Sequence, residues 1–153
     1  MKHRIVVLCV LVASFAATAR AQAPGSFAIK CNPATVSYQF SPTEEISSFV
    51  CTTDAMINGV AFNGLTFSQA NETVGGESKD WGVIVGSLVN GSLVFFQYQA
   101  VAARTGAATG VATMSYKIVG GTGTAIGISG SGTCKAAGGV ETVQACVGAY
   151  VIR

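Results

Sequence analysis

The chain has 153 residues, of which 50% are hydrophobic and only 10% are Asp, Glu, Lys or Arg, against about 25% charged residues in an average soluble domain. This composition excludes intrinsic disorder, which combines low hydrophobicity with high charge, and a coiled coil, which is rich in Glu, Lys and Leu. The formal net charge is +2 at pH 7, and the length is that of one domain.

The first residues predict an export signal. A basic start is followed by an apolar run over residues 5–17, which is the length of a signal-peptide core and too short to span a membrane. Ala19 and Ala21 are the small residues that a signal peptidase reads. We therefore predict a signal peptide over residues 1–21, a single mature domain over residues 22–153, and a secreted or periplasmic location.

Removal of this leader changes the chemistry that the chain can perform. Six basic residues then face seven acidic ones, a net charge of −1, and the single histidine, His3, is lost. A basic patch for nucleic acid is not expected. A Ser–His–Asp triad, a Cys–His pair and a zinc site with a histidine ligand are excluded. We predict no metal, no cofactor and no membrane span in the mature chain.

The mature chain lacks helical periodicity, and strand-sized apolar segments recur between turn residues. In the first half we predict strands over residues 27–31, 36–40, 46–52 and 56–67. Asn58-Gly59 and Asn63-Gly64 interrupt the last of these and favour tight turns or bulges. Residues 68–80 form the most polar stretch and predict an exposed loop.

The second half has the clearer pattern. We predict strands over residues 81–89, 92–103, 111–119, 124–134 and 143–152. Asn90-Gly91 predicts a hairpin turn, and residues 105–109 predict another. Within 111–119, one face should carry Ala112, Met114, Tyr116 and Ile118. Eight or nine short strands predict an antiparallel sandwich or barrel, and the many glycines suit strands that bend sharply around a small barrel.

Four cysteines remain in the mature chain: Cys31, Cys51, Cys134 and Cys146. An even number in an exported protein predicts disulfides, and three pairings are possible. We prefer Cys31–Cys51 and Cys134–Cys146, because each pair joins sequence neighbours that can lie on adjacent strands. A four-thiolate metal site is disfavoured because no Cys-x-x-Cys spacing occurs.

A glycine-rich segment carries a family resemblance. A strand that begins at Tyr116 runs into Gly120, Gly121, Thr122 and Gly123, and spaced glycines follow up to Gly132 and Thr133. This segment resembles the signature of the allene oxide cyclase and dirigent barrels, closest to their small exported bacterial members, and the resemblance covers residues 82–153. It implies an eight-stranded antiparallel barrel, stapled here by disulfides, with an apolar cavity and a trimeric assembly. The four motif residues themselves should form a tight hairpin turn.

The resemblance does not carry over an activity. Family members cyclise an unstable epoxide or steer the coupling of phenoxy radicals. Plant dirigent proteins have aromatic and arginine residues after the glycine motif, whereas residues 125–129 here are uncharged. No catalytic residue of the family matches a position in this chain, so the scaffold transfers and the activity does not.

The candidate ligand-binding residues are the large side chains of the predicted strands: Tyr38, Phe96, Tyr98, Met114 and Tyr116. An eight-stranded barrel either fills with side chains or holds one small ligand. We predict a non-enzymatic protein that binds a small apolar or aromatic molecule, or an extracytoplasmic interaction module. The alternatives are a cyclase, isomerase or dirigent-like enzyme that confines a reactive substrate, and a structural surface protein without a pocket. A packed interior would remove both pocket hypotheses.

Overall fold

The computed structural model describes residues 25–32, 34, 36–105, 108–136 and 142–153, so the predicted signal peptide lies outside the described residues. Its elements are β1 (Gly25–Cys31), β2 (Val36–Ser41), β3 (Glu44–Thr53), β4 (Met56–Ile57), β5 (Val60–Val74), β6 (Glu77–Leu88), β7 (Leu93–Thr105), β8 (Ala108–Gly121), the short 3₁₀ helix η1 (Gly123–Ala125), β9 (Ile128–Ala136) and β10 (Thr142–Ile152). This is an all-β chain, as predicted.

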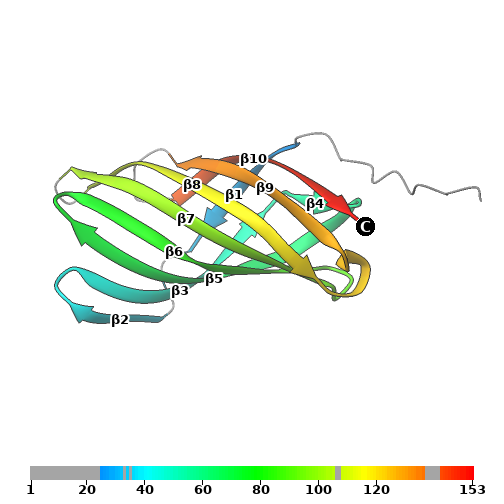
Figure 1. The fold of residues 1–153 in the computed structure, drawn as a ribbon, viewed down its shortest axis with the longest axis horizontal. Helices are drawn as coiled ribbons and strands as arrows, with labels where there is room; N and C mark the ends of the chain where they lie inside the picture. The colour runs from blue at the N-terminus through cyan, green and yellow to red at the C-terminus, as the bar shows by residue number, and fades with distance from the viewer. Residues whose placement is uncertain (1–24, 33, 35, 106–107, 137–141) are drawn as a thin grey trace, which may run out of the picture.

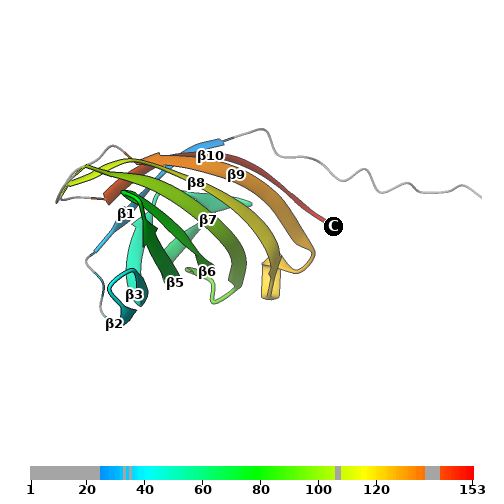
Figure 2. The ribbon, with the colours of Figure 1, turned by 60° about the vertical axis from the view of Figure 1, so that its left-hand side comes forward.

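Eight of these strands close into an antiparallel barrel (Figures 1 and 2). Neighbouring strands pair from β5 through β6, β7, β8, β9 and β10 to β1, and β1 pairs with β3. The pairing of β3 with β5 then closes the ring. β2 continues the line of β1 along the edge of β3, while β4 forms a small hairpin with the start of β5. The predicted barrel is thus confirmed.

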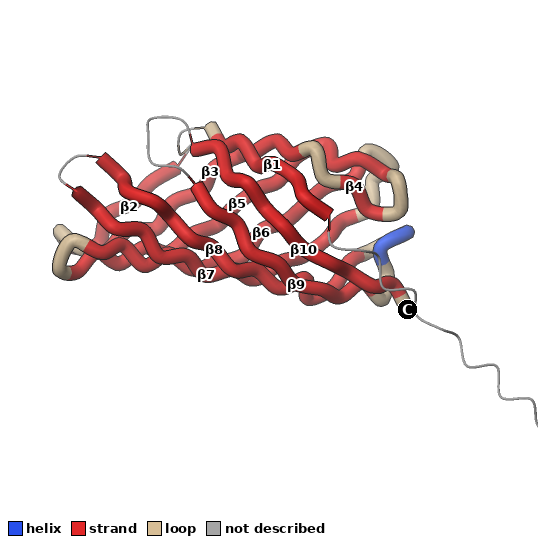
Figure 3. The backbone as a smooth tube through the Cα atoms, turned by 90° about the horizontal axis from the view of Figure 1, so that it is seen from above, coloured by secondary structure: helices blue, strands red, loops and turns tan. Residues whose placement is uncertain are grey.

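The alternation of side chains decides which residues enter the barrel. On β8, Met114, Tyr116 and Ile118 are buried, while Ser115 and Lys117 lie between them on the other face. The inward face predicted for this strand is confirmed. η1, β4 and the C-terminus lie together at one end of the barrel, and β2 lies at the other (Figures 1 and 3).

The polar stretch 68–80 is not an exposed loop. It forms the paired ends of β5 and β6, which turn at Gly75 (φ +61°) and Gly76 (φ +82°). The prediction was wrong because polarity was taken as a sign of solvent contact. In the structure, every second polar side chain points into the barrel, where these groups bond to one another.

Turn chemistry is confirmed at two of the predicted positions. Asn58 (φ +49°) and Gly59 (φ +75°) both adopt left-handed conformations between β4 and β5, as a type I′ hairpin requires. Gly91 (φ +82°) follows Asn90 in the turn between β6 and β7. The Asn63-Gly64 pair is a bulge, since the register of β5 against β6 shifts between Phe62 and Gly64. The predicted turn at 105–109 falls partly on residues 106–107, which lie outside the described residues.

The Gly-Gly-Thr-Gly motif does not form a tight hairpin turn. β8 ends at Gly121, η1 follows, and β9 begins only at Ile128. Two hydrogen bonds join this longer connection to β7. The Thr122 backbone N–H donates to the Leu93 carbonyl at 2.9 Å, and Thr122 Oγ1 accepts from the Leu93 N–H at 2.9 Å. Gly123 (φ +57°) supplies the left-handed conformation.

Both preferred disulfides are present. Cys31–Cys51 joins β1 to β3, and Cys134–Cys146 joins β9 to β10, each with a Cα–Cα distance of 4.0 Å. The partners stand directly opposite each other in their ladders. Such bonds persist in oxidising compartments outside the cytoplasm. The described residues contain no helix that is long and apolar enough to cross a membrane.

Candidate functional site: two chambers in the barrel

The interior is hollow at both ends. An apolar chamber of about 220 Å³ lies near η1 and β4. Its apolar wall is formed by Phe27, Ile29, Ile57, Phe62, Leu65, Ile84, Phe96, Met114 and Ile118. These side chains come from β1, β4, β5, β6, β7 and β8, so the closure of the barrel is what brings them together.

Aromatic rings line one side of this chamber. The centroid of the Phe96 ring lies 6.0 Å from that of Tyr116 and 6.4 Å from that of Phe62. The Phe27 ring meets the other edge of Tyr116 at 6.2 Å. The contacts with Tyr116 are edge-to-face, a favourable arrangement for aromatic pairs. They hold the Tyr116 ring against the chamber wall.

The Tyr116 hydroxyl is the polar group of interest in this chamber. No described residue forms a hydrogen bond with it, and burial raises the pKa of Tyr116 to about 12. The ring lies over Gly132 of β9 and Gly148 of β10, its neighbours in register. A Cβ on either glycine would overlap the hydroxyl. The two glycines therefore make room for a neutral phenol that can donate a hydrogen bond to a guest.

The β4 hairpin forms the mouth of the apolar chamber. The Asn58 N–H donates to the hydroxyl of Tyr150 on β10 at 2.7 Å, which ties the hairpin to the opposite wall. Asp54, an exposed carboxylate at this rim, accepts a hydrogen bond from the Ala28 N–H at 2.6 Å. Asp54 is the one carboxylate among the described residues that line this chamber.

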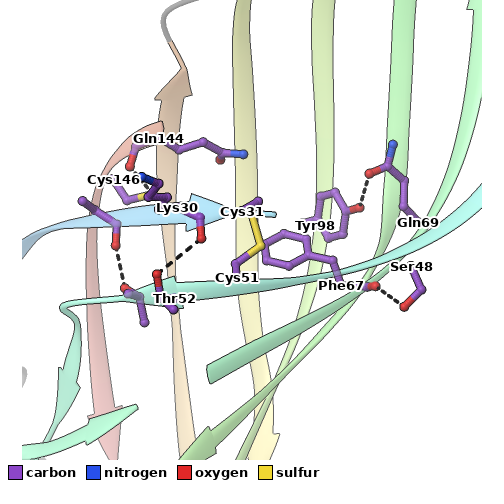
Figure 4. Close-up of a disulfide and its surroundings, with 12 residues drawn as sticks. Lys30, Cys31, Ser48, Cys51, Thr52, Phe67, Gln69, Tyr98, Gln144 and Cys146 are labelled. Carbon is purple, nitrogen blue, oxygen red and sulfur yellow. Dashed lines mark hydrogen bonds between the residues drawn. A yellow bond between two sulfur atoms is a disulfide. The ribbon is translucent and has the colours of Figure 1, made fainter. Parts of the chain in front are cut away.

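A waist of large side chains separates the two hollows. Phe49 and Phe67 stack at 4.9 Å, and the edge of Phe67 meets the Tyr98 ring at 5.4 Å. Met114 lines both chambers. The Cys31–Cys51 disulfide lies beside this waist (Figure 4).

The second chamber, of about 310 Å³, is polar along one wall. The Oδ1 atom of Asp80 accepts hydrogen bonds from Gln69 Nε2 at 3.1 Å, from Ser78 Oγ at 3.3 Å, and from Asn71 Nδ2. The Tyr98 hydroxyl donates to Gln69 Oε1 at 3.3 Å (Figure 4). Burial, and then the charge of Asp80, raise the pKa of Tyr98, so this phenol also stays neutral.

The structure divides the residues predicted to bind a ligand. Phe96 and Tyr116 line the apolar chamber, Tyr98 lines the polar one, and Met114 lies between them. Tyr38 does not belong to this group. It lies on the outer face of the edge strand β2, with 64% of its surface exposed. Alternation shows that Tyr38 shares a face with Val36 and Phe40, but it does not show whether that face points into the barrel or away from it.

Sequence reasoning missed part of both chambers. Phe27, Phe62 and Tyr150 were assigned to strands without a role, and the inward-facing polar groups were placed in a loop. The glycines as a group were expected to let the strands bend, and the specific role of Gly132 and Gly148 in accommodating the Tyr116 ring was not predicted. Gly132 pairs with both Tyr116 and Gly148. This register between three strands cannot be recognised from the sequence of any one of them.

Within the described part of the chain, no group of three or more His, Cys, Asp or Glu side chains is placed to hold a metal ion. Comparison with protein-family models, curated proteins and solved structures finds no match for this chain.

Proposed function

We propose that this is an exported binding protein that holds one small apolar or aromatic molecule in the apolar chamber. The observation that supports this most directly is a chamber of about 220 Å³ with an apolar wall and one tyrosine hydroxyl that no described residue engages. A dry apolar cavity of about 150 Å³ in another protein takes up benzene. A guest of one substituted ring fits the larger volume, and a carbonyl or ether oxygen on that ring would accept a hydrogen bond from Tyr116.

The leader and the disulfides support the export half of this proposal. A basic and apolar N-terminus with small residues before Gln22 is typical of a signal peptide, and two disulfides need an oxidising compartment. The eight-stranded barrel also agrees with the resemblance to allene oxide cyclase and dirigent proteins. The family assignment remains part of the proposal.

An enzyme that works by confinement is the second candidate. A chamber that shields a reactive molecule from water can direct its reaction with little acid–base machinery. The polar groups of the apolar chamber favour binding instead, because Tyr116 is a weak acid with a pKa of about 12 and Asp54 is exposed at the rim. The hollow interior takes away the main support for a surface protein without a pocket.

Calorimetry with two probes of similar shape tests the proposed guest. We expect ethylbenzene and acetophenone both to bind the mature protein, with acetophenone tighter because its carbonyl can accept from Tyr116. Tyr116→Phe should abolish that difference and leave ethylbenzene binding in place. The matched control is Tyr38→Phe, which removes a hydroxyl from the outer surface and should change neither affinity. Failure of both probes to bind the folded wild-type protein would refute the proposal.

The outer surface supports self-association as well. Val36, Tyr38 and Phe40 on β2 are each more than 60% exposed, and Tyr38 stands opposite Ile46 of β3, which is 48% exposed. Contiguous exposed apolar side chains of this kind mark interaction surfaces. We propose a homo-oligomer, a trimer by the family resemblance. Native mass spectrometry should give the mass of a trimer, whereas a monomer at all concentrations would refute the proposed oligomer.

A further inference from the structure

The polar chamber is a cavity because small side chains fill one of its walls. Ala102 of β7, Ala112 of β8 and Ala136 of β9 stand side by side in register. The next residue in the row is Gln144 of β10, which pairs with Ala136. Three methyl groups leave a volume of about 310 Å³ open beneath them, and Gln144 lines it from the end of the row.

Gln144 presents an unsatisfied hydrogen-bonding atom to this chamber. Its Oε1 is fully buried and has no hydrogen-bond partner among the residues that the structure describes. Native proteins rarely leave a buried side-chain acceptor without a donor. Figure 4 shows the side chain extending from β10 toward the Cys31–Cys51 disulfide, on the other side of that bond from Tyr98 and Gln69. Since no described residue donates to this atom, it is free to accept a hydrogen bond from a molecule in the chamber.

The opposite wall is already organised. β6 and β10 are separated by three strands in either direction around the eight-stranded ring, so Asp80 and Gln144 come from opposite sides of the barrel. Asp80 is fixed by the donors of β5 and β6 described above. Ser47 of β3, a buried residue, adds a hydroxyl to the lining, and Asn32 adds an amide. Polar groups therefore line the chamber on both sides, with Gln144 on one side and the Asp80 cluster on the other.

We propose that this second chamber binds a compact, neutral polyol about the size of a monosaccharide or a cyclitol. A hydroxyl group both donates and accepts, so hydroxyls on opposite sides of one small ring can donate to Gln144 Oε1 and bond to the wall around Gln69 and Ser47. The apolar part of the lining, with Phe49 and Met114, covers the carbon frame of such a ring. The Asp80 carboxylate repels an anion of the same size.

Side-chain amide NMR and calorimetry with myo-inositol and glucose test this site. We expect at least one of the two probes, at millimolar concentration, to shift the Gln144 amide resonances. Gln144→Met keeps the length of the side chain and removes both polar atoms, so it should weaken binding at least tenfold. The matched control is Gln99→Met on the outside of β7, which should bind as the wild type does. Ethylbenzene binding in the other chamber should be unchanged in both variants.

Three outcomes would overturn the inference. The first is that neither probe shifts the Gln144 amide resonances of the folded protein, which would mean that the chamber holds water alone. The second is that Gln144→Met binds the polyol as tightly as the wild type does. The third is that only an organic cation such as choline binds. If Gln144→Met does not fold, Ala112→Leu fills the same chamber from another position in the row of Gln144 and should abolish polyol binding. Because the probes for the two chambers differ, failure here is distinguishable from failure of the proposed apolar site.

Discussion

The packing of Tyr116 on two glycines leads to a specific stability prediction for Gly148→Ala. An added Cβ at this position would overlap the Tyr116 hydroxyl, lie 3.0 Å from Tyr116 Cζ, and lie 3.2 Å from the Ser131 carbonyl oxygen. Phe27 and Phe96 contact the same ring from two sides. The ring cannot retreat into those neighbours, so it must tilt into the apolar chamber.

The expected magnitude follows from two opposing effects. Overpacking of a well-packed site costs about 1–3 kcal/mol, whereas replacing glycine by alanine stabilises by about 0.4–1 kcal/mol through the unfolded chain. We expect a net loss of about 1–2 kcal/mol. For a domain of this size that loss lowers the midpoint of thermal unfolding by about 4–8 °C. Ethylbenzene should also bind more weakly, because the displaced ring occupies part of its chamber.

Thermal and urea unfolding of four variants measure this effect. Gly25→Ala is the matched control, since Gly25 pairs directly with Gly148 and has no atom within 4 Å of an added Cβ. Tyr116→Phe alone should cost little, because no described residue bonds to its hydroxyl. The double variant Gly148→Ala with Tyr116→Phe should recover most of the loss. Equal stability of Gly148→Ala and Gly25→Ala, or no recovery in the double variant, would refute the packing argument.

Three further predictions concern stability. Because burial raises the pKa of Tyr116 to about 12 from its ordinary value of about 10, the folded chain keeps a proton that the unfolded chain loses, so stability should fall between pH 10 and pH 12. The contribution of Tyr116 should be about 1–2 kcal/mol, discounted because the hydroxyl faces a cavity that water can enter. Urea unfolding as a function of pH should show a smaller loss in Tyr116→Phe than in the wild type, because Tyr98, whose pKa is also raised, still contributes in the variant. Replacing both cysteines of either disulfide by alanine should cost about 3 kcal/mol, since the bonds close loops of 20 and 12 residues; urea midpoints unchanged by both replacements would contradict this. Gln144→Met should stabilise the protein without ligand by about 1–2 kcal/mol by removing a buried unsatisfied acceptor, and a lower urea midpoint than in Gln99→Met would count against it.

Local patterns sufficed for much of the barrel. The alternation on β8 identified its inward face, and the Asn-Gly pairs marked the turns around Asn58 and Asn90, because both signals are contained within a few residues. The disulfides could be paired correctly since sequence neighbours on adjacent antiparallel strands often stand opposite each other. Each of these inferences needs only one strand or one hairpin.

The errors concern features that depend on the whole ring. Tyr38 has the alternation of an inward residue, but the short pairing of β1 with β3 leaves β2 as an edge strand outside the barrel. Asn71 and Asp80 have the polarity of a loop, but they point inward and bond to each other across the β5–β6 ladder. No local pattern distinguishes a polar residue that faces water from one that faces a partner on the next strand.

The row arrangement explains how one sheet makes two chemically different chambers. A row here is a set of inward-facing residues that stand opposite one another on neighbouring strands. Because each row crosses several strands, it sets the size and polarity of the barrel interior at one position along the barrel axis. The row with Tyr116 ends in glycines, and its phenol lies flat on backbone. The row with Ala112 ends in Gln144, and its hollow keeps an unsatisfied amide oxygen. A protein selected for stability alone would fill both hollows with larger side chains. The small residues beside the phenol in one row, and beside the amide in the other, are therefore what the two proposed binding sites would need.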